Sequence, residues 1–166
     1  MTLFSSTIPT PIGPLTYLYT EDKKVLGVFF DTQATLVEKY LEKHLDMYQV
    51  KRVTKGPYDA DFKKYFKDAK HSLQNIPVAV TGTKAQIAVW NAVGKIKSGQ
   101  VARYKDIAKR TGNEKAVRSV GTAIGANPVC LIVPCHRVLA SDGSLGGYSG
   151  GLDKKEWLLK HEGVLQ

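Results

Sequence analysis

Two cysteines, Cys130 and Cys135, lie in one apolar segment of this 166-residue chain, and His136 and Arg137 directly follow the second. A cysteine is a strong nucleophile only as the thiolate, and the pKa of a free thiol, about 8.5, falls beside a base or a cation. The neighbours of Cys135 therefore favour an activated nucleophile over a buried structural thiol. Two cysteines at this spacing leave too few soft ligands for zinc, so no metal site is expected.

The segment that carries the cysteines is predicted to be a strand that leads into a turn. Residues 127–134 are apolar and strand-like, and a glycine-rich loop (141–151) and a last helix (152–162) follow the turn. If the strand is extended, the Cα atoms of Cys130 and Cys135 lie about 16 Å apart, whereas a disulfide needs about 7 Å or less. A bend at Pro134 keeps a redox switch open as an alternative.

The elements before this segment predict a helix-turn-helix. Residues 85–96 have the apolar spacing of a helix, and residues 104–110 fit a short helix that ends at Thr111-Gly112. Asn113 is expected to cap a further helix that runs through Ala126. Two helices joined by a tight turn containing glycine are typical of this motif, although the pattern also arises by chance.

Small residues dominate the helix expected after Asn113, from Ala116 to Gly125. A reader of the DNA major groove needs long polar side chains. A helix of small residues instead fits close approach to the minor groove. Tight packing against a neighbouring helix explains the same residues and remains open.

The first half of the chain predicts a small α+β unit without obvious chemistry. Residues 15–30 read as two strands around the polar turn 21–24, and residues 77–80 as a further strand. Helical spacing predicts two amphipathic helices, whose apolar residues are Leu36, Val37, Tyr40, Leu41 and Leu45 in one, and Phe62, Tyr65, Phe66, Ala69 and Leu73 in the other. These aromatic residues are interpreted as core.

Charge is distributed unevenly along the chain. Residues 1–80 hold 11 Lys and Arg against 9 Asp and Glu, a net charge of +2, whereas residues 81–166 hold 13 against 6, a net charge of +7. Excess base in one half suggests a polyanionic partner such as nucleic acid. Neither a secretory signal nor a membrane-spanning apolar run is recognisable, so a cytoplasmic protein (nuclear in a eukaryote) without a membrane partner is expected.

The ordered set of motifs resembles the signature of the O6-alkylguanine-DNA alkyltransferases. Its residues span 83–163 and are Val89-Trp90, Tyr104, Arg118, Gly121, Asn127-Pro128, Pro134-Cys135-His136-Arg137-Val138, Gly146, Tyr148-Ser149-Gly150-Gly151, Glu156-Trp157-Leu158-Leu159 and Glu162-Gly163. The resemblance implies an α+β fold, with a ribonuclease-H-like sheet-and-helix domain at 1–80. A mostly helical winged helix-turn-helix domain at 81–166 would bind DNA and accept the alkyl group.

The resemblance also implies a reaction. The protein would flip O6-alkylguanine, and also O4-alkylthymine, out of duplex DNA, because O6 cannot be attacked inside the stack. Cys135 would take the alkyl group irreversibly in a single turnover. His136 would act as base through a water, Glu162 would orient His136, and Asn127 would be the hinge between recognition helix and active site. No cofactor is implied.

Further residues take their expected roles from the same resemblance. The Tyr104 hydroxyl and the Ser149 N–H would assist the leaving guanine, and the carbonyls of Cys135 and Val138 would select its amino group. The substrate pocket is expected to contain Val138, Tyr148, Ser149, Cys130 and Gly146. The minor-groove interface of the monomer is expected to contain Arg118, Tyr104, Ser119, Arg103, Ala116 and Gly121, with Arg118 entering the gap left by the flipped nucleotide. Cys130 is further expected to tune which O6 substituents are accepted.

Two positions depart from the family pattern, and three other functions compete with alkyl transfer. Ala85 stands where many relatives have Phe, and Arg103 stands where Ser or Thr is frequent, which suggests an added phosphate contact. The alternatives are a winged-helix regulator, a sensor that binds alkylated DNA without transfer, and a Cys-His hydrolase. Cys135 disfavours both binding classes, and stoichiometric consumption of protein would separate transfer from hydrolysis.

Overall fold

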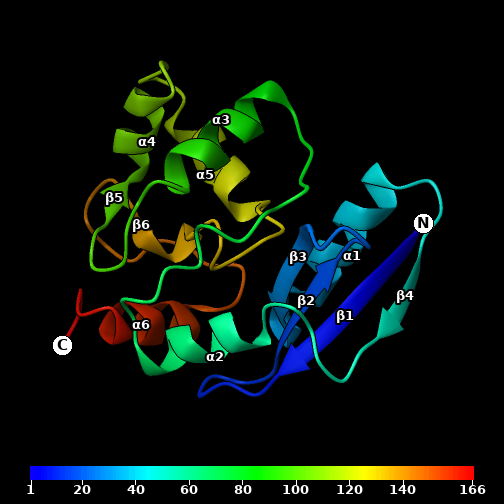
Figure 1. Ribbon diagram of the computed structural model, residues 1–166. Coiled ribbons are helices and arrows are strands. Elements are labelled where there is room, and N and C mark those ends of the chain that lie inside the picture. The colour runs from blue at the N-terminus through cyan, green and yellow to red at the C-terminus, as the bar shows by residue number, and fades with distance from the viewer.

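The chain folds into an α+β structure, seen in a computed structural model that describes residues 1–166. The strands are β1 (Thr2–Ile8), β2 (Leu15–Tyr19), β3 (Val25–Phe30), β4 (Gln49–Arg52), β5 (Ala102–Arg103) and β6 (Val138–Leu139). The helices are α1 (Ala34–His44), α2 (Asp59–Lys67), α3 (Lys84–Val93), α4 (Tyr104–Arg110), α5 (Val117–Gly125) and α6 (Leu152–His161). A sheet of the first four strands lies on one side, and α3, α4 and α5 gather on the other (Figure 1).

The four-stranded sheet has the order β3-β2-β1-β4. Strands β2 and β3 form an antiparallel hairpin in which Leu15 pairs with Phe30, so the two strands expected around residues 21–24 are confirmed. Strand β1 pairs antiparallel with β2 and parallel with β4. Neither β1 nor β4 was expected from the sequence. The stretch 77–80 makes one parallel bridge, from Val78 to Val25, beside β3.

Successive side chains of a strand point to opposite faces, so each face of the sheet has its own core. Leu18 belongs to a small cluster with Val37 and Leu41 of α1, which covers one face. Tyr17 and Phe30 point to the other face and join a cluster of 29 buried residues. That cluster continues into the second half of the chain through Trp90 of α3 and Leu158 of α6.

The amphipathic helices of the first half form as expected, although the second is shorter. Helix α2 ends at Lys67, because Asp68 adopts an extended conformation. Ala69 and Leu73 therefore follow the helix rather than extend its stripe. Helix α2 lies beside α6 (Figure 1), where the rings of Phe66 and Trp157 are 5.8 Å apart between centroids.

The helices of the second half differ from expectation mainly at their ends. Thr83 caps α3, because its hydroxyl accepts a hydrogen bond from the Gln86 backbone N–H at 3.1 Å and its own N–H donates to the Gln86 side chain at 3.0 Å. The expected cap at Asn113 is wrong. The Asn113 carbonyl instead accepts from the Ala116 N–H in a separate turn, and α5 begins only at Val117.

The expected extended strand at 127–134 is also wrong. The Val133 N–H donates to the Val129 carbonyl at 3.0 Å, so the chain reverses direction between these residues. Leu131 has a φ of 72°, in the left-handed region. An extended chain therefore does not separate Cys130 from Cys135. Both thiols are free and buried.

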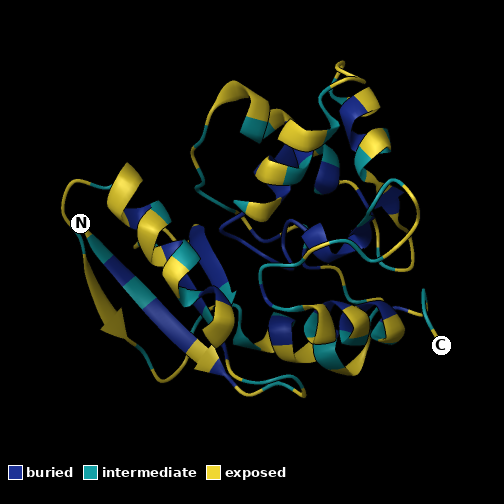
Figure 2. Cartoon of the chain, turned by 180° about the vertical axis from the view of Figure 1, so that it is seen from behind, coloured by how far each residue is buried: buried dark blue, intermediate teal, exposed yellow.

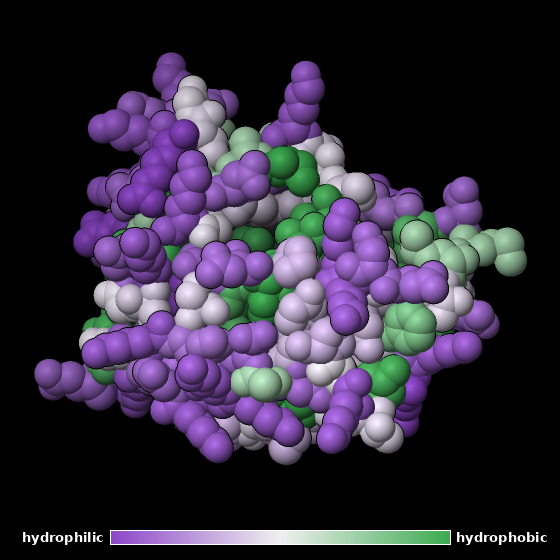
Figure 3. Space-filling view, viewed as in Figure 1, coloured by the Kyte–Doolittle hydropathy of each residue, from purple (hydrophilic) through white to green (hydrophobic).

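Most of the buried residues belong to the one cluster to which both halves of the chain contribute. Figure 2 shows the inward faces of the helices and the central strands as buried, whereas β4 is exposed along its length. Figure 3 shows hydrophobic side chains in a hollow near the centre of one face, with hydrophilic residues around it. None of the helices is long and apolar enough to cross a membrane.

Candidate active site

A tight turn held by Asn127 delivers Cys135 to the site. The Asn127 side-chain N–H donates to the Val133 carbonyl at 2.9 Å, and its side-chain oxygen accepts from the Val129 N–H at 3.0 Å. Cys135 then begins a single 3-10 turn that ends at Arg137. Asn127 is itself buried, so both of its contacts replace water in the folded state. The side chain predicted to be a hinge thus fixes the approach to Cys135.

The Cys135 thiol is buried, with 5% of the residue exposed. Burial raises the pKa of the thiol above its ordinary value, because a thiolate is poorly solvated there. The Asn127 amide, the Lys155 ammonium and the backbone N–H groups of Cys135 and His136 act in the opposite direction. The site therefore supplies donors and a cation for a thiolate that is largely shielded from bulk solvent.

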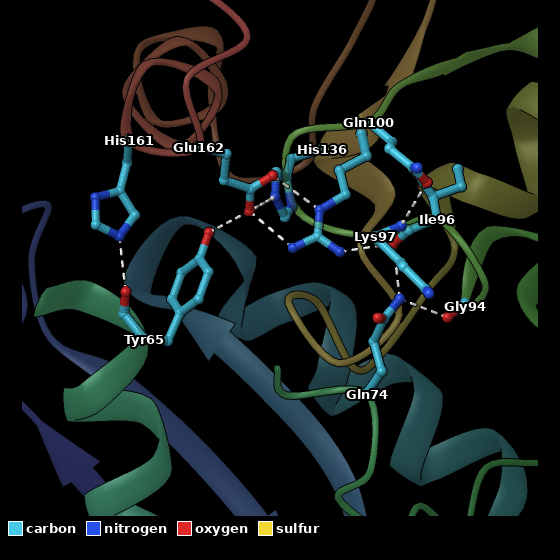
Figure 4. A network of polar contacts seen from close by, with 10 residues as sticks. Tyr65, Gln74, Gly94, Ile96, Lys97, Gln100, His136, His161 and Glu162 are labelled. Atoms are coloured by element: carbon cyan, nitrogen blue, oxygen red, sulfur yellow. Dashed lines mark hydrogen bonds and ion pairs between the residues drawn. The ribbon is translucent and has the colours of Figure 1, made fainter. Parts of the chain in front are cut away.

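Behind Cys135 lies a buried ion-pair network around Glu162, which follows the end of α6 (Figure 4). Nε2 of His136 donates to the Glu162 carboxylate at 2.8 Å, since a carboxylate only accepts. Arg137 donates to both carboxylate oxygens, at 2.8 and 2.9 Å. Burial alone would raise the pKa of Glu162, but the hydrogen bonds and charges of His136 and Arg137 hold it well below its ordinary value.

The same network leaves His136 as a neutral base. Burial lowers the pKa of His136, although the Glu162 carboxylate partly opposes that change. Because Nε2 carries the proton donated to Glu162, Nδ1 is the basic nitrogen. Nδ1 is buried and has no hydrogen-bond partner among the protein atoms. His136 is thus arranged to accept a proton on the nitrogen that does not face Glu162.

Lys155 of α6 is fully buried without a carboxylate partner. Its ammonium donates to the carbonyls of Val138 at 2.7 Å and Gly147 at 3.1 Å. Burial lowers the pKa of Lys155 from 10.5 to about 8, and the charge of Cys135 partly opposes the change. Sequence analysis missed this residue, although it precedes the buried Leu158, Leu159 and Glu162 by three, four and seven residues. A lysine at that spacing lies on the buried stripe of the helix.

A pocket of about 260 Å³ opens onto Cys135. Its lining residues come from α4, α5, the cysteine turn and the glycine-rich loop, and are Tyr104, Gly121, Ile124, Gly125, Cys135, Gly147, Tyr148 and Ser149. Five of the predicted site residues therefore meet at one cavity. Two of them, Tyr104 and Gly121, were also predicted to contact DNA, so residues expected in both roles line one cavity.

The first half of the chain holds one wall of this pocket. The Gln33 side chain donates to the Ser149 hydroxyl at 2.9 Å, and Thr32 donates to the Gly150 carbonyl at 2.9 Å.

Gly146 has a φ of 70°, and a Cβ there would lie 3.1 Å from the Tyr104 hydroxyl. Glycine is therefore favoured at this position by the backbone conformation and by the close approach of Tyr104.

Other predicted site residues lie outside the pocket lining. The Cys130 sulfur contacts the Val28 carbonyl at 3.3 Å and the Gln33 side-chain oxygen at 3.5 Å. Val138 is buried, and its carbonyl accepts from Lys155. Arg103 is exposed on β5, beside the Ser141 carbonyl. The predicted roles of these residues in substrate or DNA binding stay predictions.

Arg118, Ser119 and Ala116 lie along a second groove, of about 580 Å³, between α3 and α5. Ala85, the departure from the family pattern, lines the same groove. Arg118 and Ser119 are exposed. Arg118 and Ser119 are on α5, the helix that supplies Gly121 to the pocket, and Ala116 immediately precedes that helix.

The small residues of α5 have two different explanations. Ala123 is buried and its carbonyl accepts from the Trp90 indole N–H at 2.8 Å, so this position does pack against α3. Gly121 and Gly125 are different, because a Cβ added at either would meet no atom within 4 Å. Internal packing therefore does not require glycine there. Because these two residues have no side chains, a partner can approach the backbone of α5 closely.

The structure contains no group of His, Cys, Asp and Glu side chains that could hold a metal ion.

Comparison with known proteins connects the whole arrangement to a family. The family model described as the DNA binding domain of 6-O-methylguanine DNA methyltransferase matches residues 84–164. The methylated-DNA–protein-cysteine methyltransferase of Salmonella typhimurium is 36% identical over 166 residues, which cover 98% of this chain and 97% of that protein.

Solved structures extend the likeness to the complete fold. The structure of Mycobacterium tuberculosis O6-methylguanine methyltransferase is 31% identical and has a TM-score of 0.77, covering 96% of this chain and 92% of that one. The structure of M. tuberculosis OGT in complex with DNA is 29% identical with a TM-score of 0.78, covering 98% and 94%. The likeness therefore includes the first half, where the sequence motifs are weakest.

Proposed function

The chain belongs to the methylated-DNA–protein-cysteine methyltransferase family, and from this premise we propose that Cys135 is the residue that accepts the alkyl group. The activity is direct-reversal DNA repair, in which alkyl transfer to a protein cysteine restores the base. The observation that carries the assignment is the pocket of about 260 Å³ in which Cys135 meets Tyr104, Tyr148 and Ser149. Cys130 contacts Val28 and Gln33 instead.

The reaction follows from the groups around the sulfur. The thiol proton of Cys135 passes through a water molecule to Nδ1 of His136, whose other nitrogen is held by Glu162. The thiolate attacks the alkyl carbon, a C–S bond forms, and the C–O6 bond breaks with its electron pair staying on guanine. The Tyr104 hydroxyl donates its proton to N3 of the leaving base and recovers the proton that His136 took from Cys135. The net reaction therefore moves one proton from sulfur to guanine and the alkyl group from O6 to sulfur.

Recognition of the base is proposed to use the pocket walls. The Ser149 backbone N–H stabilises O6 as negative charge develops there. Gln33 contacts the side chain of Ser149, which leaves the backbone group free for this role. The carbonyls of Cys135 and Val138 select the guanine amino group. O4-alkylthymine is proposed as a second substrate of the same pocket.

DNA binding is proposed to use α4 and α5 as a helix-turn-helix, with α5 in the minor groove of the duplex. The accessible surfaces of Gly121 and Gly125 support close approach of the backbone. Arg118 is exposed on α5, three residues before the pocket residue Gly121, and its side chain is proposed to fill the gap left by an extracted nucleotide. A monomer is proposed to be sufficient, with residues 1–80 as a ribonuclease-H-like domain and 81–166 as a winged domain.

The experiment that tests this function measures covalent transfer. The protein is incubated with a duplex containing one O6-methylguanine, and its intact mass and methylated peptide are determined. One methyl group per chain is expected on Cys135, and the Cys135→Ser variant should gain none while still binding the duplex. An unmodified duplex is the control.

Each competing function predicts a different result in the same experiment. Methylation at Cys130 would contradict the acceptor assignment. Binding without any gain in mass would indicate a sensor or a regulator. Repair of several O6-methylguanines per chain would indicate a hydrolase.

A further inference from the structure

One oxygen of Glu162 accepts three hydrogen bonds, and one of them comes from the first half of the chain. The Tyr65 hydroxyl of α2 donates to Oε2 at 2.5 Å, the oxygen that also accepts from His136 and Arg137. Tyr65 and Glu162 are 97 residues apart in sequence. Figure 4 shows the tyrosine reaching the carboxylate from the side opposite to α6.

Ring packing alone does not account for this hydroxyl. The Tyr65 ring meets His161 edge to face at 5.3 Å between centroids, and its backbone carbonyl accepts from His161 Nε2 at 2.7 Å. Phenylalanine would keep both contacts. The hydroxyl has Glu162 as its hydrogen-bond acceptor, and the residue is only 1% exposed, so water does not substitute for that bond.

The charge on Glu162 is shared among its donors. A hydrogen bond to a carboxylate stabilises the anion and lowers its affinity for further protons. The groups facing His136 are Glu162, which raises the pKa of the imidazole, and Arg137 and Lys155, which lower it together with burial. A donor that draws charge from Glu162 therefore helps to keep His136 neutral.

We propose that Tyr65 is a positioning residue for alkyl transfer: it fixes the Glu162 oxygen that holds His136 and limits the negative charge that reaches the imidazole. This inference rests on the proposed function of His136 as the base. It gives the sheet-bearing half of the chain a role in the chemistry, through α2, in addition to its contacts with the pocket loop. Tyr65 does not touch the reacting atoms.

The test compares Tyr65→Phe with Tyr17→Phe. Tyr17 is a matched control, because its buried hydroxyl also donates to a carboxylate, Asp59 Oδ1, at 2.7 Å, away from the pocket. The rate of methyl transfer from O6-methylguanine duplex is measured against pH. Tyr65→Phe should transfer about tenfold more slowly, and its acid limb should move up by about half a pH unit or more. The upward direction follows because His136, with more of the Glu162 charge, holds its proton to higher pH.

Tyr17→Phe should lose comparable thermal stability without moving the acid limb. Titration of the His136 ring by NMR in DNA-free protein gives a second readout, in which Tyr65→Phe should shift the midpoint upward. That readout does not depend on transfer, so it separates failure of this inference from failure of the proposed function. Coincident His136 titrations in wild type and Tyr65→Phe, or equal shifts in both variants, would overturn the role of Tyr65.

Discussion

At the scale of single residues, the site has to form a thiolate in a place that water barely reaches. Cys135 is 5% exposed, and burial raises its pKa. Lys155 is the one fully buried cation near the sulfur, and it is bound by two carbonyls rather than by a carboxylate. Because no acidic partner neutralises it, its charge remains available to Cys135. Burying an ammonium in this way is costly, which points to a functional reason for its position.

Replacing Lys155 should therefore shift the titration of Cys135. Below about pH 8 the ammonium is protonated, and its charge favours the thiolate. Lys155→Met removes that charge, so a smaller fraction of Cys135 should be thiolate at each pH below about 8. The rate of alkylation by iodoacetamide, measured against pH with Cys135 identified by peptide mapping, reports the change.

Lys160→Met is the matched control for this titration. Lys160 is on the same helix but is exposed and paired with Glu156 at 3.2 Å. Its loss changes net charge equally and should leave the titration of Cys135 in place. Identical curves for Lys155→Met and wild type would remove Lys155 from the chemistry.

The sequence predicted the reactive residues better than the residues that tune them. Cys135, Tyr104, Tyr148 and Ser149 carry motif information, and they do meet at one pocket. Tyr65 was interpreted only as core, which its ring is. Its hydroxyl contacts Glu162 through the tertiary fold, and neither helical periodicity nor local motif contains that information.

At the scale of elements, the helices were predictable and several connections were not. Apolar periodicity, which local sequence contains, predicted α1, α2 and α3, and α4, α5 and α6 were also expected near their observed positions. Strand β4 is exposed along its whole length, so it has no apolar pattern to detect. The apolar run before Cys135 was interpreted as a strand. Side-chain bonds from Asn127 reverse it instead, and such bonds compete with regular structure.

A substitution on α5 should impair extraction of the base from the duplex without impairing alkyl transfer itself. Arg118 is exposed on α5 and lines the groove between α3 and α5, not the pocket that contains Cys135. Arg118→Ala should thus slow repair of O6-methylguanine in duplex DNA, by about 10-fold or more, while barely changing reaction with free O6-benzylguanine. Only the duplex has a gap to be filled. Single-turnover rates with both substrates measure the difference.

Lys39→Ala provides the charge control for Arg118→Ala. Lys39 is an exposed lysine of α1 in the first half of the chain. Removing it lowers net charge by the same amount without altering α5, so both rates should stay near wild type. Equal losses on duplex and free base in Arg118→Ala would show that Arg118 acts on chemistry rather than on extraction.

At the scale of the whole molecule, the two halves share one core and supply different parts of the site. The second half supplies the excess positive charge and the nucleophile, whereas the first half contacts the pocket loop through Gln33 and the Glu162 network through Tyr65. The backbone is shared as well, since the Val28 N–H donates to the Pro128 carbonyl at 2.9 Å. A destabilising substitution in the first half should therefore also perturb the active site.

Unfolding provides the last test, because both tryptophans, Trp90 and Trp157, lie in the second half. Phe62 of α2 is 0% exposed and belongs to the common core cluster. Phe62→Ala should cost about 3–5 kcal/mol of stability through lost burial and the cavity left behind. If the core couples the halves, the midpoints of tryptophan fluorescence and far-ultraviolet circular dichroism in urea should fall together. Lys39→Ala should leave both midpoints in place. A fluorescence midpoint that stays at the wild-type value while the circular dichroism transition splits would show instead that residues 1–80 and 81–166 unfold independently.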